Sequence, residues 1–379
     1  MAGKILFWQW NSFMGRGIER AMKKLEIPFH TFFYQLKDWE RDPVFQQRLR
    51  DELCSQAYRA VFSVNYTPLI TQVCEELGML YICWVYDSPI HIRAVEPLKK
   101  ECNRLYFFDR GQAQEYRQRG IDARYMPLAA DPLVFSESID NHNAVYQSQA
   151  AMVGQLYQTE YSHYMTPLDG WTRGYLEGIL ASQMKLYGAY LLPDMITEEL
   201  LESMNASYAR ASGGRVRIEK RELEYMLACE VTGRERRAIL GELAKYFEVK
   251  LYAPNQTEEI SGVTQVGYVD YYTGMPKVFS NTKVNLNISL KTIRTGIPLR
   301  VLDVLACGGF LVTNYQSELA EYFRAGEELV IYQDVEEVPE IVRYFLEHEE
   351  ERRRIAAAGR LRIERDFRFE DRINEMLYK

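Results

Sequence analysis

The sequence has little of several features that would point to particular classes of protein. Its six cysteines are scattered without a Cys-x-x-Cys pair, so neither a zinc site nor a disulfide framework is indicated, and the reduced thiols of the cytoplasm fit best. Positive charge is not in excess, because 46 basic residues stand against 53 acidic ones and leave a net charge of −7. That balance argues against DNA or RNA as a non-specific partner. No apolar run approaches the ~18 residues of a membrane-spanning helix. We therefore expect a cytoplasmic chain without a transmembrane segment, and peripheral contact with a membrane stays open.

Length and an apolar, aromatic composition are what the sequence offers instead. A chain of 379 residues predicts two or three domains, and 47% hydrophobic residues supply a core for each. Aromatic residues make up 13% of the chain, which suits stacking on rings or sugars as well as core packing.

In the first third of the chain, short apolar runs alternate with turns and helical patterns, which is typical of parallel βαβ units in an α/β fold. We expect strands at residues 4–8, 60–64, 80–86, 104–108 and 123–126. Polar residues follow the ends of four of these strands, at the edge where open α/β sheets bind ligands: Asn11, Asn65, Asp87 and Asp109.

The regular pattern stops around residues 131–149, which are rich in Ser, Asn, Asp and Gln and which we interpret as a connection between domains. This predicts a first domain at residues 1–135, a second at 150–360 and a C-terminal helix at 361–379. The second domain begins with a strand at 150–153 and contains a helical insertion at about 165–228. Its final helices carry dense alternating charge, typical of a solvated helix that pairs with itself.

Residues 296–314, GIPLRVLDVLACGGFLVTN, form the most informative stretch. Pro298 opens a predicted helix, whose N-terminal amides and dipole suit a phosphate. Arg300 and Asp303 are three residues apart and share a helix face. Arg300 suits the charge of a diphosphate, and Asp303 suits hydrogen bonds from ribose hydroxyls. The alternative is a surface ion pair of little energetic value.

This stretch resembles the donor-binding segment of two-domain nucleotide-sugar glycosyltransferases, and its Arg-x-x-Asp before Ala-Cys-Gly-Gly resembles the CgeB-like (spore maturation protein) branch. Other segments agree with that branch, in the same order along nearly the whole chain: residues 84–89 (WVYDSP), 108–110 (FDR), 126–131 (MPLAAD), 153–157 (VGQLY), 283–288 (KVNLNI) and the tail at 351–372.

The resemblance implies a GT-B fold, in which two Rossmann-like domains face each other across a cleft and the C-terminal helix returns to the first domain. It implies a nucleoside-diphosphate sugar as donor, with UDP favoured, bound mainly by the second domain, and no cofactor. It also implies no metal, because helix N-termini and cationic side chains stabilise the leaving diphosphate. The lack of an Asp-x-Asp triplet agrees. Thr295 stands where many retaining relatives carry Glu, so the stereochemical outcome cannot be carried over.

On the donor side, Gly154 ends the first strand of the second domain, where a residue without Cβ lets a diphosphate or sugar approach. Tyr268 stands where relatives clamp the base, and Tyr271 and Tyr272 are alternatives. Lys283 and Arg294, with Lys291, are the cations expected near the diphosphate. For each of these residues the alternative is an ordinary turn glycine, surface aromatic or solvated charge.

On the acceptor side, Asp87 is the first candidate for a general base, because partial burial after an apolar strand would raise its pKa to a useful value. The alternative is that Asp87 caps the turn in Asp-Ser-Pro. Asp109 is the second candidate, and His91 could assist. Three further residues would line the acceptor side: Asn11, Arg16 and Asn65.

The sequence thus predicts a glycosyltransferase acting on a hydroxyl of a glycan, surface polymer or protein. The rival hypotheses are a nucleotide-sugar epimerase or hydrolase and a catalytically silent nucleotide-sugar-binding module. The helical insertion is the feature that we expect to set acceptor choice or to form a homodimer.

Overall fold

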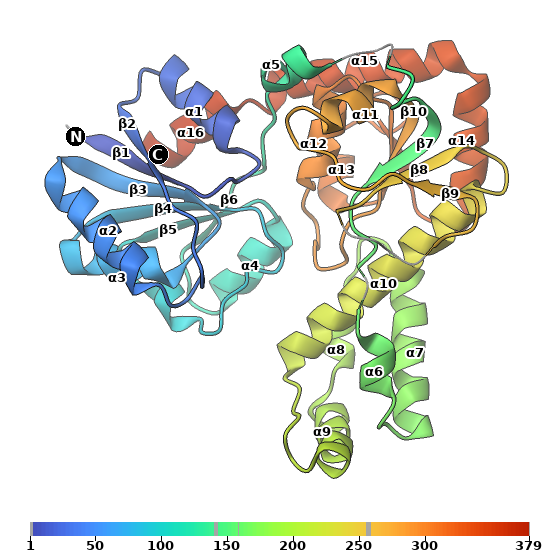
Figure 1. The fold of residues 1–379 in the computed structure, drawn as a ribbon, viewed down its shortest axis with the longest axis horizontal. Coiled ribbons are helices and arrows are strands. Elements are labelled where there is room, and N and C mark those ends of the chain that lie inside the picture. The colour runs from blue at the N-terminus through green and yellow to red at the C-terminus, as the bar shows by residue number, and fades with distance from the viewer. Residues whose placement is uncertain (1–2, 140–142, 158, 255–258, 379) are drawn as a thin grey trace. The chain divides into compact units, whose positions relative to one another are not determined.

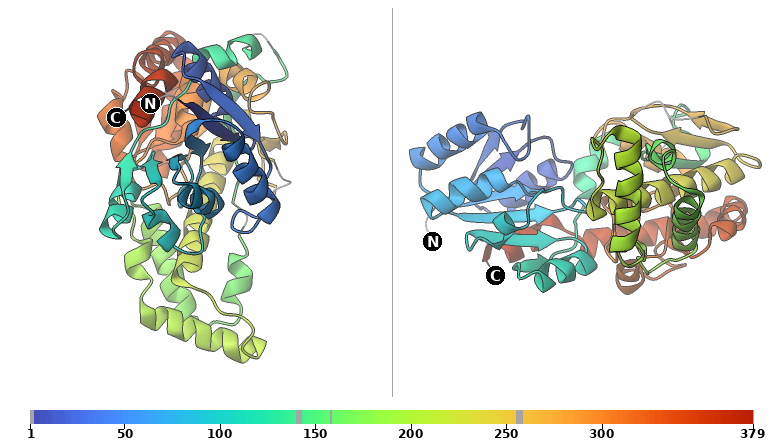
Figure 2. Two further views of the ribbon diagram at one scale, coloured as in Figure 1. Left: turned by 90° about the vertical axis from the view of Figure 1, so that its left-hand side faces the viewer. Right: turned by 90° about the horizontal axis from the view of Figure 1, so that it is seen from below.

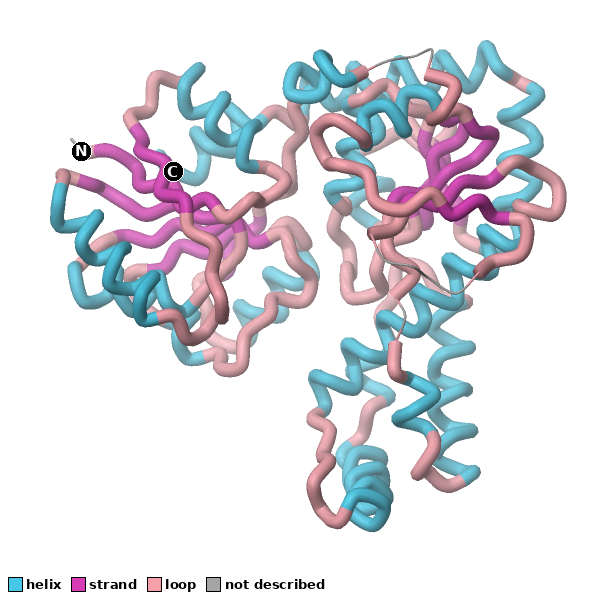
Figure 3. Tube along the Cα trace, viewed as in Figure 1, coloured by secondary structure: helices cyan, strands magenta, loops and turns pink. Residues whose placement is uncertain are grey.

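The computed structural model describes residues 3–139, 143–157, 159–254 and 259–378, so part of the predicted linker, at 140–142, lies outside the described residues. The chain forms two compact units. Unit 1 comprises Met1–Glu137, Thr295–Ala306 and Leu361–Lys379, and unit 2 comprises Ser138–Arg294 and Cys307–Arg360. Each unit is built on one parallel sheet of six strands, drawn in magenta in Figure 3.

The sheet of unit 1 has the strand order β2-β1-β3-β4-β5-β6. Its strands are β1 (Lys4–Gln9), β2 (Phe29–Phe33), β3 (Tyr58–Val64), β4 (Leu80–Val85), β5 (Asn103–Phe107) and β6 (Ala123–Tyr125). The central strands are apolar on both faces, because helices cover both. The order reverses between β1 and β3, and an open parallel sheet binds ligands beside the carboxyl ends of the strands at such a reversal.

The helices of unit 1 follow the strands in alternation. They are α1 (Gly15–Lys24), α2 (Pro43–Ser55), α3 (Pro68–Leu77), the 3-10 turn η1 (Glu96–Lys99), α4 (Arg110–Gln118), α5 (Pro132–Phe135) and α12 (Leu299–Ala306), with the 3-10 turn η2 (Ser136–Ser138) at the unit boundary. Local signals fix their ends. In α3, for example, the Thr67 hydroxyl accepts from the Leu69 N–H, Pro68 occupies the first turn, and Gly78 closes the helix at φ 63°.

The C-terminal helix α16 (Phe369–Tyr378) packs against α1, on the face of the sheet opposite α2 and α3 (Figure 1). Gly17 of α1 lies directly against the ring of Phe369, so a Cβ at this position would collide with the ring. Lys24 also forms an ion pair with Glu370, 2.5 Å between Nζ and Oε1. The expected return of the last helix to the first domain is confirmed.

The sheet of unit 2 has the order β12-β11-β10-β7-β8-β9, the 3-2-1-4-5-6 order of a Rossmann fold. Its strands are β7 (Ser148–Val153), β8 (Val249–Tyr252), β9 (Val263–Gln265), β10 (Thr282–Asn287), β11 (Leu311–Asn314) and β12 (Val330–Tyr332). Strand β7 is paired with β8 on one side and β10 on the other. The reversal of order therefore lies between β7 and β10.

Between β7 and β8 the chain forms the predicted helical insertion, a helical lobe of unit 2 that is plain in Figure 2. It consists of α6 (Tyr161–Met165), α7 (Gly170–Met184), α8 (Leu192–Met195), α9 (Glu198–Ser212) and the first half of α10 (Lys220–Leu243). The lobe has its own apolar core, which includes Leu176, Leu180 and Leu227. The second half of α10 instead packs in the core of the sheet, through Ile239 and Leu243.

The remaining helices of unit 2 are α11 (Met275–Asn281), α13 (Ser317–Tyr322), the 3-10 turn η3 (Val335–Glu337) and α14 (Val338–Glu347), followed by α15 (Glu349–Asp366), which continues into unit 1. Within α15, charges pair along the helix as expected, as between Arg362 and Asp366 four residues later. In the part of the chain that the structure describes, no helix combines the length and apolarity needed to cross a membrane.

Candidate functional site

In unit 1, two asparagines occupy the reversal of strand order. Asn11 follows β1 and Asn65 follows β3, and both have positive φ, 70° and 62°. Asparagine tolerates this left-handed conformation better than most residues, and such backbone is often found at ligand sites. Asn11 is exposed, whereas Asn65 is buried. Both lie where the strand pattern predicts a binding edge.

Asn65 holds Asp87 in place at this edge. Its amide Nδ2 donates to Asp87 Oδ2 at 2.6 Å, and its Oδ1 accepts from the N–H groups of Tyr86 and Asp87, at 2.9 and 3.1 Å. The end of β3 is thereby fastened to the end of β4. Asp87 is half-buried, and desolvation raises its pKa from 3.8 to about 6. The carboxylate is positioned and has a pKa suitable for accepting a proton near neutral pH.

Asp109, the second candidate base, is fully buried and has structural partners. Its Oδ1 caps α4 by accepting from the Gln112 N–H at 3.0 Å and also accepts from the Thr295 hydroxyl at 3.0 Å. Gly296 then passes so close to Asp109 that a Cβ would come within 2.9 Å of it. These contacts explain why Thr295–Ala306, which the sequence places in the second domain, groups with unit 1. Catalysis by Asp109 stays a prediction.

Helix α12 carries the predicted donor-binding pair in unit 1. Pro298 is buried just before the helix begins, and its carbonyl accepts from the Val301 N–H at 3.1 Å. Arg300 Nη1 and Asp303 Oδ2 are 3.2 Å apart, with side-chain exposures of 20% and 2%. The pair is therefore no surface ion pair of the kind that contributes little.

The other predicted acceptor-side residues lie on the same unit but are solvent-exposed. Arg16 is on the first turn of α1, directly after the loop that contains Asn11, and His91 is in the loop after β4, four residues beyond Asp87. Their contribution to acceptor binding stays a prediction.

In unit 2, Gly154 and Arg236 mark the reversal of strand order. Gly154 follows β7, and a Cβ there would lie 3.3 Å from Arg236 Nη1. The guanidinium donates to the carbonyl of Gln155, after β7, and to that of Ile288, after β10, with Nε to Ile288 at 3.1 Å. Arg236 therefore clamps together the two loops between which a Rossmann fold binds its ligand. The guanidinium carbon of Arg236 also lies over the ring of Tyr157, 4.8 Å from the ring centroid.

Sequence reasoning missed Arg236. The available signal was its position on α10, four residues after Thr232 and three before Ile239, which places it on the buried face of the helix. An arginine on a buried helix face has to be paired, and here it pairs with backbone carbonyls.

Beside this clamp lies a buried ion pair. Lys291, in the loop after β10, places Nζ 2.8 Å from Glu235 Oε2, and the two side chains are 7% and 0% exposed. The Glu235 carboxylate also accepts from the hydroxyls of Tyr187 and Tyr332. Lys291 is thus committed to a carboxylate in this structure, and it anchors the loop after β10 to α10.

The remaining predicted donor residues are more dispersed. Lys283 lies near the start of β10, at the opposite end of the strand from the binding edge, so the structure does not bring it to Gly154. Tyr268 follows β9 with 68% of its surface exposed. Arg294 stacks over the ring of Tyr190, 5.5 Å from its centroid. No group of three or more His, Cys, Asp or Glu side chains that could hold a metal lies among the described residues.

Comparison with known proteins gives a match to part of the sequence and to the whole fold. A model of the glycosyl transferase-like family matches residues 232–378. None of the curated sequences compared is significantly similar.

Three solved structures with a similar fold are each about a tenth identical to this chain in sequence. A sucrose-phosphate synthase from Thermosynechococcus elongatus has 10% identity and a TM-score of 0.57, with 99% of this chain and 97% of that chain covered. A glycosyltransferase from Rickettsia africae has 9% identity and a TM-score of 0.57 over 100% and 99%. The HepE protein of Anabaena, in complex with UDP-glucose, has 9% identity and a TM-score of 0.54 over 99% and 98%.

The chain therefore has the two-domain α/β fold of the GT-B glycosyltransferases, as expected. The family match, from the second half of α10 to the end of α16, and these neighbours together support the class of GT-B glycosyltransferases.

Proposed function

We propose that this protein is a CgeB-like, metal-independent glycosyltransferase. It transfers a sugar from a nucleoside-diphosphate sugar, with UDP favoured, to a hydroxyl of a glycan, surface polymer or protein. The observation that carries the proposal is the reversal of strand order between β7 and β10, where Gly154 and the Arg236 clamp form a ligand edge. Arg236 and β10 lie within the residues that match the glycosyl transferase-like family.

Two neighbours support UDP as the nucleotide. HepE was solved with UDP-glucose, and a trehalose-phosphate synthase of Burkholderia vietnamiensis, with a TM-score of 0.51 and 11% identity, is described as UDP-forming. In this chain we assign the diphosphate charge to Arg300 and the ribose hydroxyls to Asp303, whose i, i+3 pairing holds both side chains in a defined geometry. Gly154 and Arg294, which belong to unit 2, stay predicted donor-binding residues.

On the acceptor side we assign the general base to Asp87. The acceptor oxygen bonds to the anomeric carbon while the bond from that carbon to the diphosphate oxygen breaks, and the nucleoside diphosphate leaves. In an inverting transfer, the proton of the acceptor hydroxyl passes to the Asp87 carboxylate. Asn65 is the positioning residue, because its amide fixes the carboxylate from the neighbouring strand.

The cysteines fit our proposal of a cytoplasmic location, because the structure joins none of the six in a disulfide. This proposal predicts that the purified protein is equally stable with and without a reducing agent. A stabilising disulfide in protein isolated from its cell would contradict it.

The experiment that tests the function is a screen of the purified protein against UDP-, GDP-, ADP-, CMP- and dTDP-sugars, with thermal shift and release of free nucleotide measured together. We expect a UDP-sugar to stabilise the protein by mass action and to be turned over when an acceptor is offered, with or without EDTA. Turnover without an acceptor would instead indicate an epimerase or hydrolase, and binding without turnover on any acceptor a silent module. No shift with any donor would refute the proposal.

A further inference from the structure

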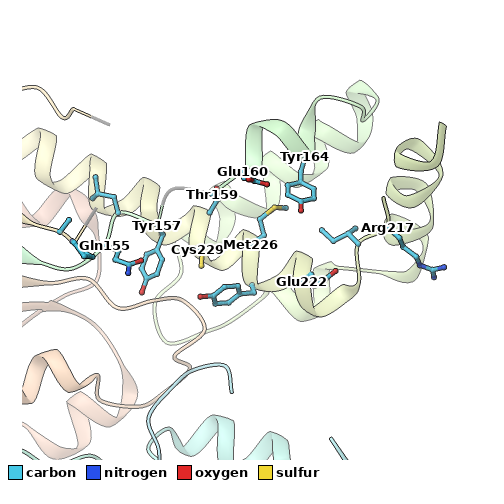
Figure 4. A pocket seen from close by; sticks show the side chains of 14 residues that line it. Gln155, Tyr157, Thr159, Glu160, Tyr164, Arg217, Glu222, Met226 and Cys229 are labelled. Carbon is cyan, nitrogen blue, oxygen red and sulfur yellow. The ribbon is translucent and has the colours of Figure 1, made fainter. Parts of the chain in front are cut away.

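The helical insertion and the loops after β7 and β8 line an open cavity of about 550 Å³, and none of its lining residues has been given a role in donor or acceptor binding above (Figure 4). Its walls come from the loops after β7 and β8, from α6 and from the first half of α10. The lining residues are Gln155, Leu156, Tyr157, Thr159, Glu160, Tyr164, Arg217, Ile218, Glu222, Tyr225, Met226, Cys229, Ala253 and Pro254. The volume is that of an ordinary small-molecule site.

The cavity begins at the ligand edge of unit 2, because Gln155 and Tyr157 directly follow Gly154. Tyr157 has a φ of 50°, which is rare for a bulky residue and is a form of backbone strain found mainly at functional sites. The loop is held in this conformation by α10, where Gly233 lies so close that a Cβ would come within 2.5 Å of the Leu156 carbonyl oxygen. The packing of α10 thus fixes the inner wall of the cavity.

The lining has the chemistry of a carbohydrate site. Tyr157, Tyr164 and Tyr225 offer aromatic faces, and Met226 adds apolar surface. The Glu160 carboxylate and the Tyr164 hydroxyl have no hydrogen-bond partner in the described part of the chain, so both are available to ligand hydroxyls. Carboxylates accept strong hydrogen bonds from such groups.

The charges favour a neutral ligand. Among the described residues that line the cavity, there are two carboxylates, Glu160 and Glu222, and a single guanidinium, that of Arg217. Figure 4 shows Arg217 at the outer end of the cavity with its guanidinium directed away from the other labelled side chains. An anionic ligand would therefore meet net negative charge.

We propose that this cavity binds a neutral saccharide, and that the saccharide is the acceptor of the transfer. The second statement rests on the proposed function, whereas the first stands on the cavity alone. The insertion then selects the acceptor, because α6 and the first half of α10 supply much of the cavity wall.

The test is an array of immobilised neutral oligosaccharides of glucose, galactose, mannose and N-acetylglucosamine, with trigalacturonic acid as the anionic probe. We expect the full chain to bind at least one neutral probe and not trigalacturonic acid. Tyr164→Ala and Tyr225→Ala should each weaken binding at least tenfold. Because truncation of a packed tyrosine can unsettle the fold, Glu160→Gln and Glu222→Gln serve as milder variants. Glutamine at position 222 preserves the capping box of α10.

The control is Tyr175→Ala, in the same insertion, because Tyr175 stacks on Trp171 outside the cavity. It should bind as the unmodified protein does. Absence of binding to every neutral probe, preference for trigalacturonic acid, or equal loss in the control would overturn the inference. Donor-induced thermal shift separates the two proposals. If a donor gives a normal thermal shift but the protein binds no saccharide, only the proposal for the cavity is refuted. If the protein binds a saccharide and Tyr164→Ala abolishes that binding, but no donor gives a thermal shift, only the proposed function is refuted.

Discussion

Asp87→Asn should make the protein inactive and, at neutral pH, more stable. Burial raises the pKa of the Asp87 carboxyl from 3.8 to about 6, so the folded protein holds its proton more tightly than the unfolded chain does. The contribution of Asp87 to the free energy of unfolding is therefore fully present below pH 3.8 and is lost as pH rises through about 6. Because the folded and unfolded pKa values differ by about two units, ionisation of Asp87 lowers the free energy of unfolding by about 3 kcal/mol above pH 6 and by about 1 kcal/mol near pH 4.5. Asparagine is neutral and still accepts from Asn65, so it avoids this cost.

Urea unfolding of both proteins at several values between pH 4.5 and 7.5 measures the effect, with tryptophan fluorescence as the probe because Trp84 lies on the adjoining strand. The stability advantage of Asp87→Asn should grow with pH. Asp51→Asn, at an exposed site on α2, is the matched control and should show no such growth. In the unmodified enzyme, kcat/KM should decrease as pH falls below about 6, because the base becomes protonated. A difference in stability that does not depend on pH, or normal turnover of Asp87→Asn, would refute the reasoning.

Three further predictions follow from the described contacts. Gly233→Ala should destabilise unit 2 by about 1–3 kcal/mol through overpacking, whereas Gly241→Ala, on the same helix with only an ordinary contact at 3.4 Å, should be neutral or stabilising in thermal unfolding. Lys291→Ala should lose about 3–5 kcal/mol in urea unfolding because its buried partner Glu235 would be left uncompensated, and an effect under 1 kcal/mol would contradict the burial of the pair. Arg300→Ala should weaken UDP binding in calorimetry by about tenfold to a hundredfold, while Arg343→Ala, at an exposed ion pair, should bind normally.

The sequence predicts the fold well because apolar runs and turns report directly on strands and their ends. Asn11, Asn65 and Asp87 were placed at strand ends on this basis, and the structure puts them there. Strand β2 and helix α2 were missed. Strand β2 is an edge strand, and none of its residues is fully buried, so it lacks the continuous apolar run of the central strands.

The positions of the candidate site residues could be predicted only where they depend on a strand end or on spacing along one helix. The three-residue spacing of Arg300 and Asp303 correctly indicated a shared helix face. Contacts between distant segments left no such signal. Arg236 binds carbonyls 81 and 52 positions away, and Asp109 holds Thr295 across 186 positions. Lys283 is a residue that the sequence places near the diphosphate and the structure does not. The direction of β10 puts it at the end of the strand away from the binding edge.

Helix α10 constrains how the insertion can differ among proteins of this architecture. One unbroken helix of 24 residues carries the lobe core in its first half and the Arg236 clamp in its second. Each residue added or removed between the two halves rotates one against the other by ~100° and shifts them by ~1.5 Å. The cavity wall and the Arg236 clamp therefore keep their relative orientation about the helix axis only when the length of α10 changes by about a whole number of turns. Exchange of the lobe for another acceptor specificity should succeed when the helical phase of α10 is kept, and fail when it slips by one or two residues.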